Sequence, residues 1–425
     1  MRVAVIGGGI GGLTTALSLH AAGIEVDVFE ATAEILPLGV GINLLPHAVR
    51  ELTELGLAPR LAAIGIETEC LMYANMHGQE IWREPRGKAA GYGWPQYSLH
   101  RGKLQMTLLA ALAERIGQDR IHLDHALSDF DSRGRGAVAR FKSRLTGVDR
   151  GQIEVDVIAA CDGIHSAARR KLYPDEGPPK WNRRILWRGV TESAPFLGGR
   201  TMIMAGYQDR KFVCYPIDPE ASARGRSLTN WIAELTYPAD HEWRREDWNR
   251  RGRLEDFLPM FEEWAFDWLD VPGLITGAEV VYEYPLVDRD PVENWTSGRL
   301  TLLGDAAHPM YPIGSNGASQ AILDARTFAY ELAQAGSPDA AIARYETQRR
   351  PATTKLVLAN RGNGPEQVMQ LAHERAPNGF TDLEAVISKA ERDEIAANYK
   401  RLAGFDREAL STRPSLTPAR AQATA

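Results

Sequence analysis

The first 30 residues constrain the fold of this chain most strongly. Arg2–Ile6 is a short apolar run, as expected for a buried strand of a parallel sheet. The motif Gly7-x-Gly9-x-x-Gly12 follows, and beyond it apolar residues recur at helical spacing. Ile24–Glu30 is then a second short strand. A strand, a helix and a strand within so short a segment predict a βαβ unit and hence an α/β fold.

The glycine motif predicts a dinucleotide-binding turn. Gly7 allows a tight turn, Gly9 lets the backbone approach a pyrophosphate, and Gly12 lets the helix pack closely on the strand. The helix N-terminus at Ile10–Gly11 presents free N–H groups and a positive dipole end to phosphates. Glu30 ends the second strand, where an acid accepts hydrogen bonds from ribose hydroxyls. The alternative is an ordinary glycine turn beside a solvated acid, and the motif does not separate FAD from NAD.

The composition is typical of a soluble globular chain. Its 425 residues correspond to two or three domains of roughly 150 residues each. The net charge of -6 does not favour nucleic acid or an anionic membrane as partner. No run approaches the roughly 20 apolar residues of a membrane span. The three cysteines form no CxxC pair, so we expect neither disulfides nor a metal site, and a reducing cytoplasmic location.

After the first βαβ unit, the residue pattern changes from helical to strand-like and back to helical. Helical patterning covers residues 48–64, 103–116, 319–336 and 340–361. Between Arg184 and Tyr237, β-branched and aromatic segments alternate with polar turns and predict an antiparallel sheet. Seven of the ten tryptophans lie between Trp181 and Trp268; they either pack this sheet or wall a flat apolar cavity. Strands with a turn at Ser132–Gly134 are expected over 121–141.

Two further segments deliver a carboxylate at the end of an apolar strand. Asp156–Ala160 leads into Cys161-Asp162-Gly163, and Arg299–Leu303 leads into Gly304-Asp305. Ligands bind at this end of the strands in open α/β sheets. For either aspartate alone, the alternative is a helix N-cap. Past Asp305, the segment Gly314–Ala318 frees backbone N–H groups just before a helix, where negative charge on a bound ring is stabilised.

These motifs, in this order, resemble the group A flavoprotein aromatic hydroxylases of the para-hydroxybenzoate hydroxylase type. The resemblance covers roughly residues 2 to 360. It implies that Asp162 and Gly163 contact both FAD and the nicotinamide cofactor, and that Asp305 binds ribityl or pyrophosphate oxygens of FAD.

A closer resemblance is to the phenazine-modifying monooxygenases of pyocyanin biosynthesis. It rests on longer strings at Pro37–Asn43, His100–Gln105, Trp187–Glu192, Tyr284–Pro291 and Gly314–Asp324. It implies that Arg101 and Gln105 contact the phosphate and ribityl region of FAD. It also implies that Gly39–Gly41, including Gly41, line the flavin edge and that Gly314, Asn316, Gly317 and Ala318 hold the isoalloxazine. Two departures are Ala168, where valine is usual, and His47, where relatives often have asparagine or a small residue.

The resemblance implies a discontinuous domain organisation. A Rossmann-like FAD-binding domain of the glutathione-reductase type takes residues 1–70, 95–180 and 281–360. A substrate domain built on the antiparallel sheet takes residues 71–94 and 181–280. A C-terminal helical segment follows at 361–410, and the Ser/Thr/Pro/Ala-rich residues 411–425 read as a flexible tail.

The implied activity is that of a single-component monooxygenase. NADH or NADPH reduces FAD, O2 forms a flavin C4a-hydroperoxide, and one oxygen passes to an aromatic or N-heteroaromatic ring, with or without decarboxylation. The hard chemistry belongs to the flavin, while the protein positions the ring and excludes water. The chain has no second Rossmann fingerprint, in agreement with a nicotinamide that visits transiently. The expected partner is a small aromatic molecule, and the expected assembly is a monomer or homodimer.

Candidate substrate-binding residues follow from their side-chain chemistry. Arg188 is expected to bind a substrate carboxylate; the alternative is an ion pair with Glu192. Tyr207 and Tyr215 are expected to hydrogen-bond a phenolic oxygen; the alternative is that they pack in the sheet. His47 is expected to act as an acid or base near the flavin; the alternative is that it is an ordinary residue at a helix N-terminus.

Other functions on the same scaffold are a flavin halogenase, a flavin reductase or a non-catalytic flavin-binding sensor. The Trp-x-Trp-x-Ile-Pro string of halogenases is absent from the sequence. A sensor would keep the FAD motifs but show no substrate-stimulated NAD(P)H oxidation.

Overall fold

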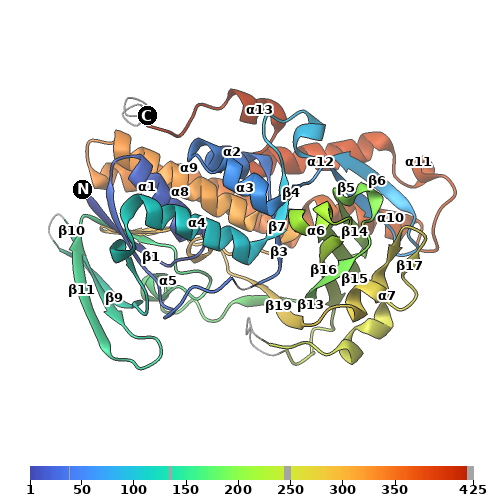
Figure 1. Ribbon diagram of the computed structural model, residues 1–425, viewed down its shortest axis with the longest axis horizontal. Helices are drawn as coiled ribbons and strands as arrows, with labels where there is room; N and C mark the ends of the chain where they lie inside the picture. Colours follow the sequence, from blue (N-terminus) through green and yellow to red (C-terminus); the bar gives the residue numbers. More distant parts are fainter. Residues whose placement is uncertain (38, 134–135, 244–249, 419–425) are drawn as a thin grey trace.

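Two large sheets organise the protein (Figure 1). The computed structural model describes residues 1–37, 39–133, 136–243 and 250–418. In the six-stranded sheet the order is β20 (Thr296–Ser297), β21 (Leu300–Leu302), β12 (Val157–Ala160), β1 (Arg2–Ile6), β2 (Glu25–Phe29) and β8 (Ile121–His122). Its neighbouring strands are parallel except for β20 and β21. The predicted α/β architecture is confirmed.

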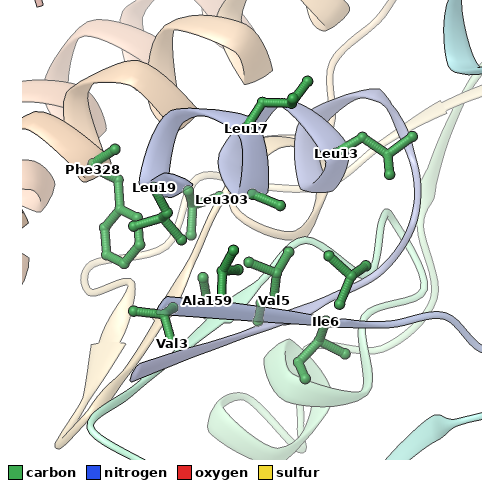
Figure 2. Close-up of a cluster of buried hydrophobic side chains, with 14 of the residues drawn as sticks. Val3, Val5, Ile6, Leu13, Leu17, Leu19, Ala159, Leu303 and Phe328 are labelled. Carbon is green, nitrogen blue, oxygen red and sulfur yellow. The ribbon is translucent and has the colours of Figure 1, made fainter. Parts of the chain in front are cut away.

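The core of this half lies between the six-stranded sheet and two helices. β12 and residues 3–6 of β1 are apolar and buried, as parallel strands covered on both faces must be. Val5 pairs with Ala159 in register, and both lie below α1 (Ile10–Ala21) in Figure 2. Leu19 of α1 meets Phe328 of α8 (Gly317–Gln334) in the same cluster. The core therefore fixes the ends of β1, β12 and β21 relative to the first turns of both helices.

The second sheet has seven strands and is antiparallel except where β14 meets β5. Its order is β19 (Val281–Asp288), β13 (Lys180–Ser193), β16 (Ser227–Thr236), β15 (Arg210–Pro216), β14 (Thr201–Tyr207), β5 (Cys70–Ala74) and β6 (Glu80–Pro85). The antiparallel sheet expected between residues 184 and 237 is confirmed. The chain enters this sheet twice, first at β5 and β6 and again from β13 onward. The residue boundaries of the two domains stay a prediction.

Smaller elements connect and flank these sheets. A three-stranded sheet of β3 (Gly41–Leu44), β7 (Tyr97–His100) and β4 (Gly65–Glu67) lies between the two halves, and β9 (Ala126–Arg133), β10 (Gly136–Lys142) and β11 (Asp149–Val155) form another. β17 (Ala265–Phe266) pairs with β18 (Leu269–Asp270). The strands expected over 121–141 are present, whereas the turn expected at Ser132–Gly134 includes residues outside the described ones.

The remaining α-helices cover the sheets. They are α2 (Pro46–Glu54), α3 (Ala58–Ile64), α4 (Arg101–Ile116), α5 (Ala167–Leu172), α6 (Pro219–Ala223), α7 (Val271–Thr276), α9 (Pro338–Arg361), α10 (Gln367–Arg375), α11 (Leu383–Val386), α12 (Lys389–Ala403) and α13 (Arg407–Thr412). Short 3-10 helices are η1 (Gly87–Ala90), η2 (Gln118–Arg120), η3 (Leu197–Gly199), η4 (Leu254–Asp256), η5 (Leu258–Met260), η6 (Gly304–Ala306), η7 (Ile313–Ser315) and η8 (Gly364–Glu366). None of the described helices is both long and apolar enough to span a bilayer.

The single helix expected over 48–64 is instead two helices. Gly56 adopts φ +74°, a left-handed conformation that glycine tolerates and that ends a helix. Pro59 then stands in the first turn of α3, where its missing N–H costs nothing. The apolar periodicity continues across this break, which explains why it predicted one helix.

The described tryptophans of the second sheet pack its face rather than a cavity. Trp187, Trp231 and Trp264 are buried in one apolar cluster, and Trp181 and Trp268 pack against it. Gly189 permits this packing, because a Cβ there would press on the Trp231 ring. Trp248 lies outside the described residues. The packing interpretation is therefore confirmed for this part of the cluster.

The chain end is anchored as far as the structure describes it. Arg50 donates to the carbonyls of Leu410 and Arg413 at 3.1 and 2.7 Å. Arg413 pairs in turn with Glu51 of α2, and Thr417 accepts a hydrogen bond from Arg326 at 2.8 Å. Residues 411–418 thus contact buried charges of α2 and α8, and the flexibility expected for the tail stays a prediction. Residues 419–425 lie outside the described part.

Candidate active site

The turn between β1 and α1 is shaped by its glycines. Gly7 has φ +106°, and a Cβ on it would overlap the Cys161 carbonyl. A Cβ on Gly12 would overlap the Gly7 carbonyl. By contrast, a Cβ on Gly9, which caps α1, would meet nothing within 4 Å. The first turn of α1, at Ile10 and Gly11, therefore presents its free N–H groups to open space.

Glu30 and Gln105 close on this turn from two sides. The Glu30 carboxylate accepts hydrogen bonds from the Gly8 and Thr32 amides at 2.6 and 2.8 Å. Gln105 of α4 donates to the Gly8 carbonyl at 2.8 Å. The structure thus brings both residues to the glycine turn. Their contact with a ribose or phosphate stays a prediction.

Asp162 follows β12 at the same edge of the sheet. One carboxylate oxygen accepts from the Ala167 amide at 2.7 Å and so supports the start of α5. The other oxygen is buried and has no hydrogen-bond partner among the described residues. Burial raises the pKa of this carboxyl. The helix-cap interpretation therefore accounts for one oxygen and leaves the second without a donor from the described part of the chain.

Asp305 and Arg101 carry opposite charges and line a recess. Both residues are exposed to solvent, Asp305 in η6 and Arg101 at the start of α4. Yet desolvation by surrounding protein raises the pKa of Asp305 and lowers the pKa of Arg101. A group that water reaches but protein largely surrounds lies in a concave surface. The charges of Asp305 and Arg101 act on each other across this recess.

Asp324 of α8 holds the loop that carries Asp305. Its carboxylate accepts from the Gly304 amide at 3.0 Å, from His308 Nε2 at 2.5 Å and from Arg349 at 2.7 Å. Burial alone would raise the pKa of Asp324, but His308 and Arg349 outweigh it and hold this pKa below its usual value. His308 therefore has a structural role, because it helps to hold Asp324 and the loop. The sequence analysis assigned no role to Asp324, although this residue ends the segment Gly314–Asp324 that carries the resemblance.

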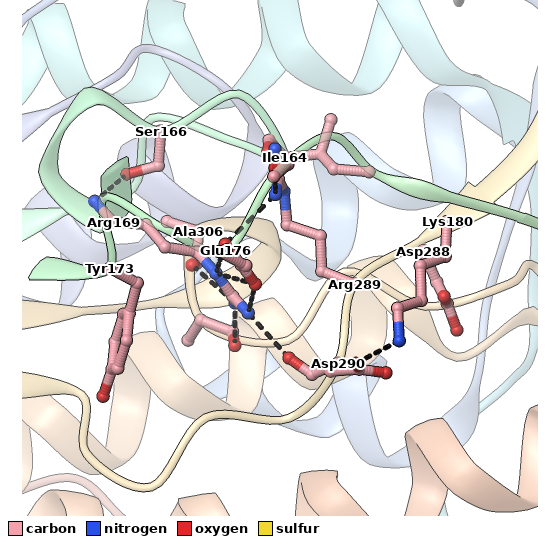
Figure 3. A network of polar contacts seen from close by, with 12 residues as sticks. Ile164, Ser166, Arg169, Tyr173, Glu176, Lys180, Asp288, Arg289, Asp290 and Ala306 are labelled. Atoms are coloured by element: carbon pink, nitrogen blue, oxygen red, sulfur yellow. Dashed lines mark hydrogen bonds and ion pairs between the residues drawn. The ribbon is translucent and has the colours of Figure 1, made fainter. Parts of the chain in front are cut away.

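A buried network ties the two aspartate turns together (Figure 3). Arg169 donates to the carbonyls of Ala306 and Ala307 at 3.2 and 2.7 Å and pairs with Glu176 at 2.6 Å. Arg289 donates to the Ile164 carbonyl at 2.9 Å and shares Glu176 at 3.0 Å. Because one arginine spans both loops, the turns after β12 and β21 are fixed relative to each other.

The loop before α8 makes a second glycine-shaped wall. Gly314 has φ +67°, and a Cβ on it would overlap the Tyr399 hydroxyl. Asn316 is fully buried and donates to the Gly314 carbonyl and to Tyr399, both at 3.0 Å. A Cβ on Gly317 would meet nothing within 4 Å. The N-terminus of α8, from Gly317 to Ala318, is thus open to a ligand.

Gly41 faces the second sheet across the interface of the two halves. Its amide donates to Asn230 at 2.7 Å, and its carbonyl accepts from Arg188 at 3.3 Å. A Cβ on Gly41 would lie 2.6 Å from the Tyr215 ring. Burial raises the pKa of Tyr215 to about 12, although Arg188 opposes this rise, so the phenol is neutral at physiological pH. The structure therefore brings Arg188 and Tyr215 to Gly41, together with Asn230, which sequence reasoning missed.

The alternative proposed for Arg188 is wrong, because Glu192 pairs with Arg224 and Arg226 instead. One nitrogen of Arg188, Nε, is buried without a partner among the described residues. Tyr207 does not lie with Arg188 and Tyr215. Its ring stacks on His373 with the ring centres 3.8 Å apart, so the packing interpretation applies to this residue.

The structure does not place His47 beside Gly41, Arg188 and Tyr215. Its ring is fully buried and stacks on Phe405 at 5.3 Å, and neither ring nitrogen has a partner among the described residues. Burial lowers the pKa of His47 to about 3, with smaller contributions from Arg413 and Arg349. A neutral imidazole that is fully buried and has no hydrogen-bond partner among the described residues has no visible path for a proton, so we assign it no acid–base role.

The residues of this recess fit an extended dinucleotide. Its parts follow one another from the glycine turn with Glu30 and Gln105, past Arg101 and Asp305, to the Gly314 and Gly41 loops. Two helix N-termini and one cation offer donors to phosphates and an anionic ring. One oxygen of Asp162 lacks a donor among the described residues, and Gly9 and Gly317, whose Cβ atoms would meet nothing, leave room for a ligand close to the backbone.

Comparison with known proteins agrees with this fit. The family model described as "FAD binding domain" matches residues 1–246 and 286–360. The chain is 47% identical to the phenazine 1,6-dicarboxylic acid hydroxylase PhzS of Lysobacter antibioticus, over 84% of this chain and 89% of that protein. It is 34% identical to the 3-amino-4-hydroxybenzoate 2-monooxygenase PtnB3 of Streptomyces platensis, over 86% and 88%. A salicylate hydroxylase substrate complex shares the fold, with a TM-score of 0.74 and 22% identity over 98% and 99% of the two chains.

Proposed function

Because this chain belongs to the FAD-binding-domain family of flavoprotein aromatic monooxygenases, we propose that it hydroxylates an aromatic carboxylic acid at the expense of NAD(P)H and O2. In balanced form, the ring C–H, O2, NAD(P)H and one proton yield the phenol, water and NAD(P)+. Phenazine carboxylates are the first candidates, since a phenazine dicarboxylic acid hydroxylase is 47% identical. Aminohydroxybenzoate hydroxylation by a second relative supports the same acidic substrate class.

One observation carries the proposal. Arg188 presents a cation, with an unpartnered Nε, beside the glycine loop expected at the flavin edge. A half-buried guanidinium whose Nε lacks an acceptor favours a planar anionic ligand, and carboxylates match its geometry. An acidic aromatic substrate would supply that anion where the two halves of the protein meet.

The cofactor contacts follow from the recess. We propose that FAD is held by Gly7, Gly9, Ile10, Gly11, Gly12, Glu30, Gly41, Arg101, Gln105, Asp162, Asp305, Gly314, Asn316, Gly317 and Ala318. When bound, FAD supplies hydride acceptance from NAD(P)H and activation of O2 for transfer of one oxygen atom to the ring. The open N-terminus of α8 would stabilise negative charge on the flavin ring.

The chain's own side chains would position the substrate and exclude water. Arg188 would bind the carboxylate, and the neutral Tyr215 phenol would donate a hydrogen bond to an oxygen substituent of the ring. Leu186, Leu286 and Ile313 are buried in one apolar cluster at this interface. An apolar wall of this kind keeps water from a reactive oxygen species.

The test is a screen of the holoenzyme for NAD(P)H oxidation stimulated by phenazine carboxylates, aminohydroxybenzoates and their uncharged parents. We expect acids to stimulate oxidation and the parents to be poor substrates. Arg188→Gln should raise KM for the acid roughly tenfold or more, in line with about 1.5–3 kcal/mol for a hydrogen bond to a charged group. Arg224→Gln, an exposed cation that pairs with Glu192, is the matched control. Oxidation that no aromatic compound stimulates would favour a reductase or a sensor.

A further inference from the structure

A small, partly open cavity lies behind the Gly314–Ser315 loop, and Tyr399, which bonds to Asn316, also lines it. β5 and β14 form one wall through Leu71, Met202 and Met204, and α12 forms the opposite wall. The space open to the centre of a water-sized sphere is about 20 Å³, which is room for one or two oxygen atoms. The cavity therefore has the size of a small polar group and not of an aromatic ring.

Polar atoms of its lining lack partners. The Tyr73 hydroxyl, Arg86 Nε and Gln96 Oε1 are buried, and none has a hydrogen-bond partner among the described residues. These three residues are at most 9% exposed. A buried polar group left unsatisfied costs about 1–3 kcal/mol. The Tyr73 hydroxyl and Arg86 Nε are donors, so they indicate a ligand acceptor in this cavity, whereas Gln96 Oε1 is itself an acceptor and would not bond to a carboxylate.

The charges of the lining do not cancel. Glu84 lies between two cations, 2.6 Å from Arg86 and 2.5 Å from Lys400. The side chains of Glu84 and Arg86 are 5% and 11% exposed, and that of Lys400 is 23% exposed. Glu366, which acts on Tyr73 electrostatically, is already paired with Lys211 at 2.5 Å. One positive charge is thus left over, and an anion offsets it better than a neutral group does.

The cavity lies on the same face of the second sheet as Tyr215, two strands away from it. Met204, in its wall, pairs in register with Val213, and Val213 and Tyr215 lie on the same face of β15 because side chains alternate along a strand. Met204, Val213 and Tyr215 belong to one buried cluster with Tyr73. β5 lies two strands from β15, about 10 Å at the usual strand spacing. A planar aromatic molecule lying along this face would reach from one position to the other.

We propose that this cavity is a second acid subsite, which takes a carboxylate on the aromatic substrate distinct from the one held by Arg188. Tyr73 and Arg86 donate hydrogen bonds to it, and Lys400 supplies the remaining charge. The inference rests on the proposed function and narrows it: the preferred substrate carries two acidic groups at opposite ends of a planar ring system.

The test measures the affinity of the FAD-bound protein for phenazine 1,6-dicarboxylate and for unsubstituted phenazine, by the change in flavin absorbance. Tyr73→Phe removes the hydroxyl and keeps the ring that stacks on Trp82. We expect it to weaken dicarboxylate binding roughly tenfold and to leave the phenazine affinity within about twofold. Lys400→Met should act the same way without disturbing a fully buried residue. Tyr330→Phe, on α8 roughly 20 Å along the helix from Gly317, is the matched control.

Two outcomes would overturn the subsite. Equal weakening for both ligands would mean that the cavity only supports the fold, and no change in either affinity would mean that it holds only water. An unaltered flavin spectrum and melting temperature would show that the variants are folded. If the wild-type protein shows no aromatic-stimulated NAD(P)H oxidation at all, the proposed function fails; if it does while Tyr73→Phe binds the dicarboxylate normally, only the subsite fails.

Discussion

Replacing His47 with leucine should remove much of the acid sensitivity of folding. The ring is fully buried, its nitrogens lack partners among the described residues, and its pKa is lowered from 6.5 to about 3. In the unfolded chain the same ring binds a proton near its ordinary pKa, so falling pH favours the unfolded state. The stabilisation is complete above about pH 6.5 and is lost progressively as the pH falls toward 3.

The magnitude follows from linkage. Each pH unit inside this window costs about 1.4 kcal/mol, so acidification from about pH 7 to about pH 5 removes roughly 2 kcal/mol from the free energy of unfolding. His47→Leu replaces the ring by an apolar side chain of similar volume, so it should abolish this component. The assay is urea unfolding of both proteins across this pH range. Equal pH dependence in the two proteins would refute the enclosed, neutral ring and reopen an acid–base role for His47.

The remaining predictions concern the cofactor recess. Asp324→Asn removes the charge that holds the Asp305 loop and should raise the Kd for FAD at least roughly tenfold, as measured by fluorescence titration. An unchanged affinity would contradict the role of Asp324 in holding this loop. Gly9→Ala should fold like the wild type but bind FAD far more weakly, because its methyl group fills only ligand space. Gly336→Ala, whose Cβ also meets nothing, is the control and should leave FAD binding unchanged. Equal FAD affinities of the two variants would argue against FAD binding at the Gly7–Gly12 turn. Gly41→Ala places a methyl 2.6 Å from the Tyr215 ring and should lower the fraction of consumed NAD(P)H that yields hydroxylated product.

Those parts of the site that lie within one short segment could be predicted from the sequence. The glycine turn and the two aspartates each follow an apolar strand directly, so a few consecutive residues show both the strand and the ligand-binding groups at its end. The small residues of the Gly314 loop also predict an open helix N-terminus, and the resemblance added Arg101 and Gln105. The contacts that these groups make with FAD stay predictions, whereas the family and the fold are confirmed.

The parts that depend on distant pairing could not be predicted. Asn230 meets Gly41 across 189 positions of the sequence, and no local pattern marks it. The cavity around Tyr73 and Arg86 arises only when β5, β14 and α12 pack together. His47 illustrates the opposite error, since a histidine near a helix start suggested chemistry, and only the packing of Phe405 shows an enclosed ring.

The most direct test of the central claim follows the oxygen atom. The holoenzyme is supplied with NAD(P)H and an aromatic acid under isotopically labelled O2, and the product is analysed by mass spectrometry. If the chain is an aromatic monooxygenase, the product gains one labelled oxygen atom on the ring for each NAD(P)H that is productively consumed. NAD(P)H consumption with every acid tested, but with no labelled oxygen in any product, would contradict the account.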